Sequence, residues 1–143
     1  MNKNKKIILT LGLGVIFIIT LYYCIKTNNK IVPNEYLNDK IISKLESEKY
    51  IDFSKVTNFH WDEMMIFTPY SDINEYFKKV DIDNSIKYRD DIYSIVFIEN
   101  NKIIKMVNLD RKYDFDTETT NRKIENKNSK FKILNNNILY KDK

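Results

Sequence analysis

A run of residues without a charged side chain, Ile7–Ile25, is the feature that most restricts what this chain can form. As a helix with a rise of ~1.5 Å per residue, the run measures roughly 28 Å, which is close to the hydrocarbon thickness of a bilayer. A helix also satisfies every backbone hydrogen-bonding group of the run inside lipid. We therefore expect Ile7–Ile25 to lie in the lipid bilayer as a transmembrane helix.

The flanks of this run predict its orientation. Three lysines within Lys3–Lys6 precede it, and lysines before a span favour a cytoplasmic N-terminus. Tyr22 and Tyr23 stand at the far end, where aromatic rings suit the headgroup level. We expect a single-pass protein of the cell membrane, with residues 1–30 as cytoplasmic tip and anchor and residues 31–143 as an extracytoplasmic domain.

Three processed leaders are the alternatives to an uncleaved anchor. A cleaved signal peptide has an apolar core of ~7–15 residues that ends at small residues. The present run is longer, and Tyr22–Lys30 contains no such cleavage motif. A lipoprotein needs a small residue before its cysteine, whereas Tyr23 precedes Cys24. A pilin-like leader needs an acidic residue soon after its cleavage site, and the first acid is Glu35. We therefore favour the anchor.

The basic residues are unevenly distributed along the chain. Residues 1–30 hold five of the 24 basic residues and none of the 20 acidic ones, although the whole chain has a net charge of +4. The other 19 basic residues leave residues 31–143 with a net charge of −1. A nucleic-acid binder needs a clustered basic face that neutralises phosphates. We therefore do not expect nucleic acid as a partner.

The counts of cysteine, histidine and glycine exclude several kinds of site. Cys24 and His60 are the only residues of their types, so the chain forms neither an internal disulfide nor a Cys/His zinc site. Acidic residues recur from Asp110 to Glu118, but an EF-hand loop needs a glycine at its sharp turn. Both glycines lie in the apolar run, so a glycine-rich phosphate loop is excluded. We expect no metal and no cofactor.

The pattern after residue 31 predicts an α+β domain with helices packed on one face of an antiparallel sheet. Apolar residues at helical spacing predict a helix over about 35–49, with Asn34 as its N-cap. Residues 50–58 fit either a short extended piece or a loop. The segment Met64–Phe67 is apolar on both faces, as in a buried strand, and Pro69 ends it.

A helix-start signal follows this strand. Asp72 with Glu75 three residues later resembles a capping box and predicts a second, short helix. Its apolar face is expected to hold Ile73, Phe77 and Val80.

The last third of the chain predicts two hairpins. Strands over 92–98 and 102–109 flank Asn100 and Asn101, which tolerate the positive φ of a tight turn. A second hairpin is expected over residues 130–141. The segment between the hairpins is polar and aperiodic, so we predict a mobile loop there.

The stretch Phe59–Asp72 holds the only tryptophan and the only histidine, and it has two interpretations. In the structural one, Trp61 fills the edge of the core and Asp62 accepts backbone N–H bonds at a turn. In the functional one, Trp61, Asp62 and Tyr70 line a small pocket that carries one charge. We favour the structural interpretation and keep these three residues as the candidate ligand-binding set.

The segment Asp52–Phe77, about a fifth of the chain, contains an F-x-W-D core, an apolar strand and a P-Y pair before a helix. In these features it resembles small secreted or membrane-anchored proteins of low-GC Gram-positive bacteria. The resemblance implies a location and a shared fold, and it implies no activity. Many of those proteins look like lipoproteins, and the present chain departs from them because it lacks a lipobox.

Three functions are compatible with these observations. We expect a membrane-anchored binding or interaction domain without catalytic activity, whose ligand is an envelope protein, a peptide or a small molecule. One alternative is a small envelope enzyme that uses Asp62 with His60 or Tyr70, although a histidine without an identified partner is weak evidence. The other is a structural subunit of a membrane complex that assembles through the Ile7–Ile25 helix.

Overall fold

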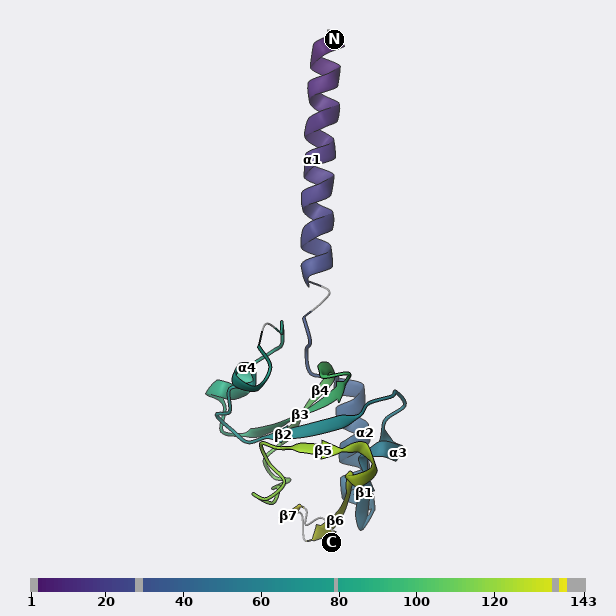
Figure 1. Ribbon diagram of the computed structural model, residues 1–143, viewed down its shortest axis with the longest axis vertical. Helices are drawn as coiled ribbons and strands as arrows, with labels where there is room; N and C mark the ends of the chain where they lie inside the picture. Colours follow the sequence, from purple (N-terminus) through teal and green to yellow (C-terminus); the bar gives the residue numbers. More distant parts are fainter. Residues whose placement is uncertain (1–2, 28–29, 79, 135–136, 139–143) are drawn as a thin grey trace. The chain divides into compact units, whose positions relative to one another are not determined.

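The computed structural model describes residues 3–27, 30–78, 80–134 and 137–138. The chain divides into two units, residues 1–30 and residues 31–143. The first unit contains helix α1 (Lys3–Thr27) (Figure 1). Among the residues that the structure describes, no helix combines the length and the apolar character that crossing a membrane requires.

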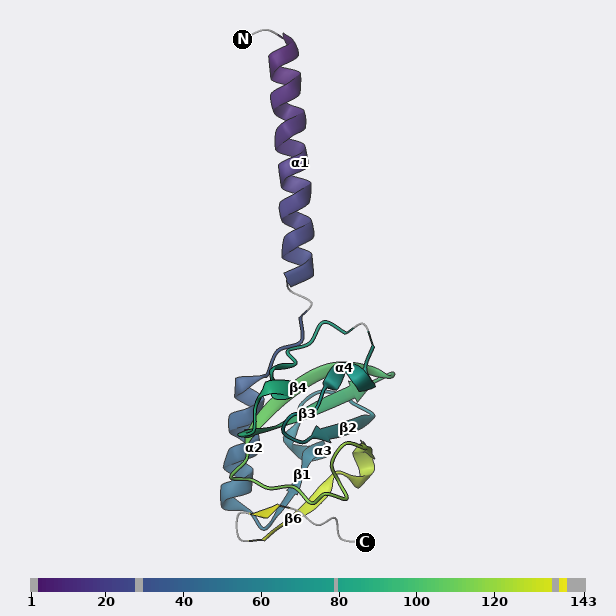
Figure 2. The same cartoon turned by 90° about the vertical axis from the view of Figure 1, so that its left-hand side faces the viewer.

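The second unit is a small α+β domain with antiparallel strands, as predicted (Figures 1 and 2). Its strands form a four-stranded sheet in the order β4-β3-β2-β5 and a smaller sheet in the order β1-β6-β7. In chain order, the elements are α2 (Glu35–Ser47), β1 (Tyr50–Asp52), α3 (Phe53–Val56), β2 (Glu63–Phe67), α4 (Ile73–Tyr76), the 3-10 helix η1 (Ser85–Tyr88), β3 (Ile92–Glu99), β4 (Lys102–Asp110), β5 (Lys123–Glu125), the 3-10 helix η2 (Asn126–Asn128), β6 (Lys130–Leu134) and β7 (Asn137–Ile138).

Helix α2 forms as its sequence pattern predicts. The side chain of Asn34 accepts a hydrogen bond from the Leu37 N–H at 2.8 Å and caps the first turn. Leu37, Ile41 and Leu45 recur at helical spacing and are all buried. The helix ends at Ser47, because Glu48 already has an extended backbone.

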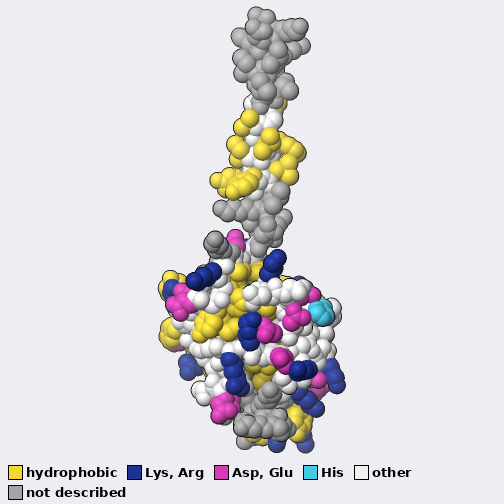
Figure 3. Space-filling model, in the orientation of Figure 1, with side chains coloured by type: hydrophobic (Ala, Val, Ile, Leu, Met, Phe, Trp, Pro, Cys, Tyr) yellow, Lys and Arg dark blue, Asp and Glu magenta, His cyan; other side chains and the backbone are white. Residues whose placement is uncertain are grey.

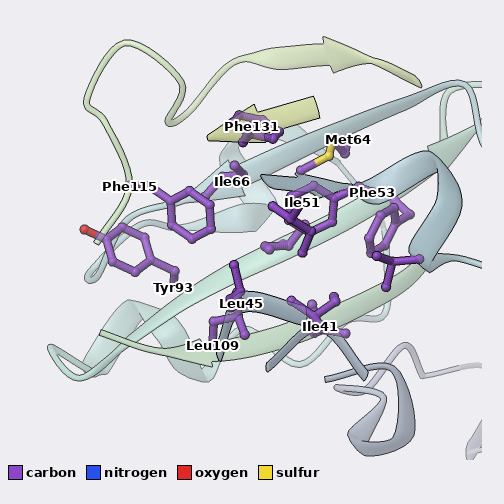
Figure 4. Packing of buried hydrophobic residues seen from close by; sticks show 14 of the residues in the cluster. Ile41, Leu45, Ile51, Phe53, Met64, Ile66, Tyr93, Leu109, Phe115 and Phe131 are labelled. Atoms are coloured by element: carbon purple, nitrogen blue, oxygen red, sulfur yellow. The ribbon is translucent and has the colours of Figure 1, made fainter. Parts of the chain in front are cut away.

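Helix α2 covers one face of the four-stranded sheet together with α3, β1 and β6. Figure 4 shows its residues Ile41 and Leu45 among side chains of the strands, with Phe131 of β6 in the same cluster. Met64 and Ile66 of β2 point to this face, since alternate residues of a strand share one side. These contacts form the larger of two hydrophobic clusters.

Helical segments also cover the opposite face, so the prediction that helices lie on one face is wrong (Figure 2). Met65 and Phe67 of β2 pack there against Ile73 of α4 and Ile86 of η1. The physical reason is that Met64–Phe67 is buried on both sides, and a strand with two apolar faces needs a cover on each.

The segment 111–130 contains ordered structure, although its sequence has no period. Its strand β5 pairs antiparallel with β2 through Met64 and Ile124. Tyr113 and Phe115 are buried in the larger cluster. The buried apolar residues of this segment are isolated in the sequence, and a three-residue strand is too short to show a recognisable alternation of apolar and polar residues.

Both predicted hairpins are present among the described residues. Asn100 and Asn101 have φ values of 49° and 59° between β3 and β4, as a tight turn of this kind requires. Strand β6 pairs with β7 through Ile133 and Ile138. The turn at 135–136 and the predicted strand residues after 138 lie outside the described residues. Strand β6 also pairs with β1, so residues 50–52 are extended, whereas residues 53–56 form the short helix α3, which neither option for this segment predicted.

The residues that lead into α2 are hydrogen-bonded to the domain. The Ile31 N–H donates to the Asp81 carbonyl at 2.8 Å, and the Asp83 N–H donates to the Ile31 carbonyl at 2.7 Å. The Asn34 N–H donates to the Met106 carbonyl of β4 at 2.8 Å. The start of the domain is therefore held by the 81–83 segment and by the outer edge of β4.

Candidate functional site

Trp61 is part of the core, immediately before β2. Trp61 is only 2% exposed, and its ring packs edge-on against the Phe97 ring with 5.2 Å between the ring centroids. The indole Nε1–H donates to Thr57 Oγ1 at 2.8 Å, which satisfies its one polar group. These contacts support the structural interpretation of Trp61.

Asp62 connects the start of β2 to the turn of the first hairpin. Its Oδ2 accepts a hydrogen bond from the Asn100 N–H at 2.8 Å. Its own backbone N–H donates to the Ile98 carbonyl, and its carbonyl accepts from the Asn126 N–H, both at 2.8 Å. The prediction that Asp62 accepts a backbone N–H at a turn is confirmed.

His60 lies on the surface with 76% of its side chain exposed. Its Nδ1 is 2.9 Å from Glu99 Oε1. Within the described part of the chain, no hydrogen bond joins His60 to Asp62. The partner of His60 is therefore the Glu99 carboxylate, and the structure does not pair His60 with Asp62.

A shallow depression of about 720 Å³ lies at the start of β2. It is lined by Phe59–Glu63 and Glu125–Lys127. Polar groups on its walls contact each other: Asn126 Nδ2 donates to the Trp61 carbonyl at 3.1 Å, and Lys127 Nζ is 2.9 Å from Glu125 Oε2. We call it the Trp61 depression. The Asn126 amide and the Lys127 ammonium on its walls are thus bonded within the domain.

Tyr70 lies at the other end of β2, so the predicted pocket of Trp61, Asp62 and Tyr70 is not formed. Strand β2, five residues at ~3.3 Å each or roughly 17 Å long, lies between Tyr70 and the other two residues, and Tyr70 does not line the Trp61 depression. The backbone of Tyr70 has a φ of 65°, and its N–H donates to the carbonyls of Ile86 and Arg89 at 3.1 and 3.2 Å. Its side chain points to solvent, with 63% of the residue exposed.

A second hollow, which the sequence reasoning missed, lies on the face of the sheet that α4 covers. It has a volume of about 610 Å³. Apolar side chains of Met65, Phe77 and Val80 line it together with the half-exposed Tyr76. We call it the α4 groove. Its other lining residues are polar or cationic: Lys78, Asn101, Asn121, Arg122 and Lys123.

Helix α4 supplies one wall of this groove, and Asp72 fixes the helix. The Asp72 carboxylate accepts hydrogen bonds from the Asn74 N–H at 3.0 Å, from Asn84 Nδ2 at 2.7 Å and from Lys87 Nζ at 2.6 Å. The bond from Lys87, followed by the bond from Asn84, lowers the pKa of Asp72. The ring of Tyr76 packs edge-on against Phe67 with 5.1 Å between centroids, which orients it at the groove.

The charged residues that line the α4 groove, among those the structure describes, are all cationic. They are Lys78, Arg122 and Lys123. Lys123 Nζ is held by Glu63 Oε2 at 2.6 Å and by Asn101 Oδ1 at 3.3 Å. Lys78 and Arg122 form no ion pair with any residue that the structure describes. Figure 3 shows hydrophobic side chains on the side of the domain that carries α4, with both basic and acidic side chains beside them.

The α4 groove combines residues from four separate stretches of the chain. Only Phe77 and Val80 were singled out by their spacing, as the apolar face of the second helix. Within the described ranges, no group of His, Cys, Asp and Glu is arranged to hold a metal ion. No family model, curated protein or solved structure matches the chain.

Proposed function

We propose that this protein is a membrane-anchored extracytoplasmic domain that binds a partner in the α4 groove and performs no catalysis. The observation that carries the proposal is the composition of the groove. Its lining combines apolar side chains with Lys78 and Arg122, which have no ion pair among the described residues, whereas the polar groups around Trp61 and Asp62 are bonded within the domain.

The anchor is supported by the sequence of the N-terminal unit. The uncharged run Ile7–Ile25 follows three lysines, and the backbone over Lys3–Thr27 is helical. In a helix, the backbone N–H and C=O groups of such a run hydrogen-bond to each other, as they must in lipid, where water is absent.

The predicted location of the domain is tested by its exposure to protease. Intact protoplasts that carry the full chain with an N-terminal epitope are treated with protease. We expect loss of the 31–143 domain and retention of a short epitope-bearing fragment, because the lysines favour an inside N-terminus. Full protection of the domain in intact protoplasts, with digestion only after lysis, would contradict the proposed orientation.

Binding in the groove is tested by photo-crosslinking in cells that naturally contain the protein. The photoreactive residue p-benzoylphenylalanine replaces Tyr76, which is 49% exposed at the groove, or Tyr36 on α2, which is 76% exposed. We expect a crosslinked product of defined mass from position 76 and none of that mass from position 36. The same product from both positions, or from neither, would refute the groove as the binding site.

A further inference from the structure

We infer that the α4 groove takes an acidic segment of a partner protein that inserts at least one apolar side chain. This inference rests on the proposed function and specifies the class of partner. The first reason is the positive charge of the lysine and arginine side chains that line the groove. The second reason is the apolar side chains that line it with them.

The charged residues that line the groove are cationic among those the structure describes, although the domain as a whole has a slightly negative net charge. Residues 31–143 have a net charge of −1, whereas Lys78, Arg122 and Lys123 meet at this one hollow. Glu63 already pairs with Lys123, which leaves Lys78 and Arg122 without a carboxylate among the described residues. Complementary charges across an interface determine which partner binds, and two unpaired cations select carboxylates.

The apolar lining of the groove favours an apolar contribution from the same partner. The groove is lined by the buried residues Met65 and Phe77 and by Tyr76, which is half exposed. Methionine and aromatic side chains form adaptable apolar surfaces at which partner side chains bind. A volume of about 610 Å³ accommodates one or two large side chains and not a folded domain.

A polyanion without apolar groups fits this groove less well. Nucleic acids bind along extended arrays of cations that neutralise many phosphates. Among the described residues, the α4 groove offers three cations together with apolar side chains, and one of the three cations is already paired. A peptide that combines aspartate or glutamate with a phenylalanine or leucine matches both parts.

The test uses the full chain in a non-ionic detergent and three fluorescent probes. The first probe is an eight-residue peptide with six acidic residues, one phenylalanine and one leucine. In the second, every acidic residue is replaced by its amide, and the third is a single-stranded oligonucleotide with a similar charge. We expect anisotropy to show at least tenfold tighter binding of the acidic peptide than of either other probe, and weaker binding in higher salt.

Charge-reversal variants locate the binding. Lys78→Glu and Arg122→Glu should each weaken the acidic peptide at least fivefold. Lys49→Glu is the matched control, because this substitution changes the net charge by the same amount. Lys49 is exposed between α2 and β1 and does not line the groove. Equal binding of the acidic and amide peptides, equal binding of the oligonucleotide, or an equal loss with Lys49→Glu would overturn the inference.

Failure of this inference is distinguishable from failure of the proposed function. If the crosslink from position 76 persists in the Lys78→Glu and Arg122→Glu double variant, the groove binds a partner and the acidic class is wrong. If position 76 gives no specific crosslink and the acidic peptide does not bind, both proposals are wrong.

Discussion

The Trp61 depression and the α4 groove adjoin the same two strands, β2 and β5, and differ in what their side chains contact. At the first, the indole, the carboxylate of Asp62 and the amide of Asn126 all bond within the domain. At the second, Lys78 and Arg122 have no ionic partner among the described residues. The comparison teaches that the most distinctive stretch of the sequence, Phe59–Asp72, mainly stabilises the fold. The α4 groove, in contrast, is formed by common residue types from separate parts of the chain.

The largest expected effect on stability belongs to the Trp61 depression. Trp61→Ala should lower the free energy of unfolding by roughly 3–5 kcal/mol, because the change removes a large buried ring and leaves a cavity. Urea denaturation of the full chain in detergent, followed by circular dichroism because Trp61 is the only tryptophan, measures it. Tyr36→Ala, at an exposed aromatic residue of α2, is the control. A variant that unfolds like the parent would show that Trp61 does not hold the core.

A smaller loss is expected from Asp72, which supports the α4 wall of the groove. Its pKa is lowered in the folded state, so its contribution to stability is present above its unfolded pKa of about 3.9 and disappears as the pH falls through the folded value. Asp72→Asn should destabilise the domain at pH 7 by less than Trp61→Ala does. The difference between variant and parent should narrow as the pH falls below about 4. A difference that is constant from pH 7 to pH 3 would contradict this role.

Substitutions in the α4 groove should separate binding from stability. Arg122→Glu is expected to change the free energy of unfolding by no more than about 0.5 kcal/mol, since an exposed side chain without an ionic partner contributes little. Its effect should appear in peptide binding alone. A loss of stability as large as that of Trp61→Ala would show that Arg122 belongs to the fold, and the comparison between the two hollows would fail.

The smallest effect is expected at His60. His60→Ala removes an exposed contact with Glu99, and exposed pairs contribute ~0–1 kcal/mol at most. Thermal melts should therefore coincide with those of the parent, and binding of the acidic peptide should not change. A loss of binding without a loss of stability would transfer the site from the α4 groove to the Trp61 depression.

Local patterns predicted the elements whose formation depends on neighbouring residues. Helix α2 follows from the Asn34 cap and the spacing of its apolar residues, and the first hairpin follows from Asn100 and Asn101. Strand β5 was missed because three residues carry no period and its pairing with β2 joins segments about 60 residues apart.

The candidate site was less predictable than the fold. The roles of Trp61 and Asp62 follow from residue type, because a tryptophan in a small domain is usually buried and an aspartate near a turn accepts backbone bonds. Tyr70 was placed with them because it is close in sequence, yet an intervening strand carries it to the opposite end. The α4 groove depends on which distant segments meet, and no short stretch of sequence contains that information.

The hydrogen bonds of Ile31 have a mechanical consequence. Tension that reaches the domain through its N-terminal end is first resisted by the two bonds between Ile31 and the 81–83 segment, and then by the bond from Asn34 to Met106. The 81–83 segment directly follows Val80, which lines the α4 groove. A load on the N-terminal end of the domain would therefore act on the 81–83 segment, next to Val80 of the α4 groove, before it acts on strand β4.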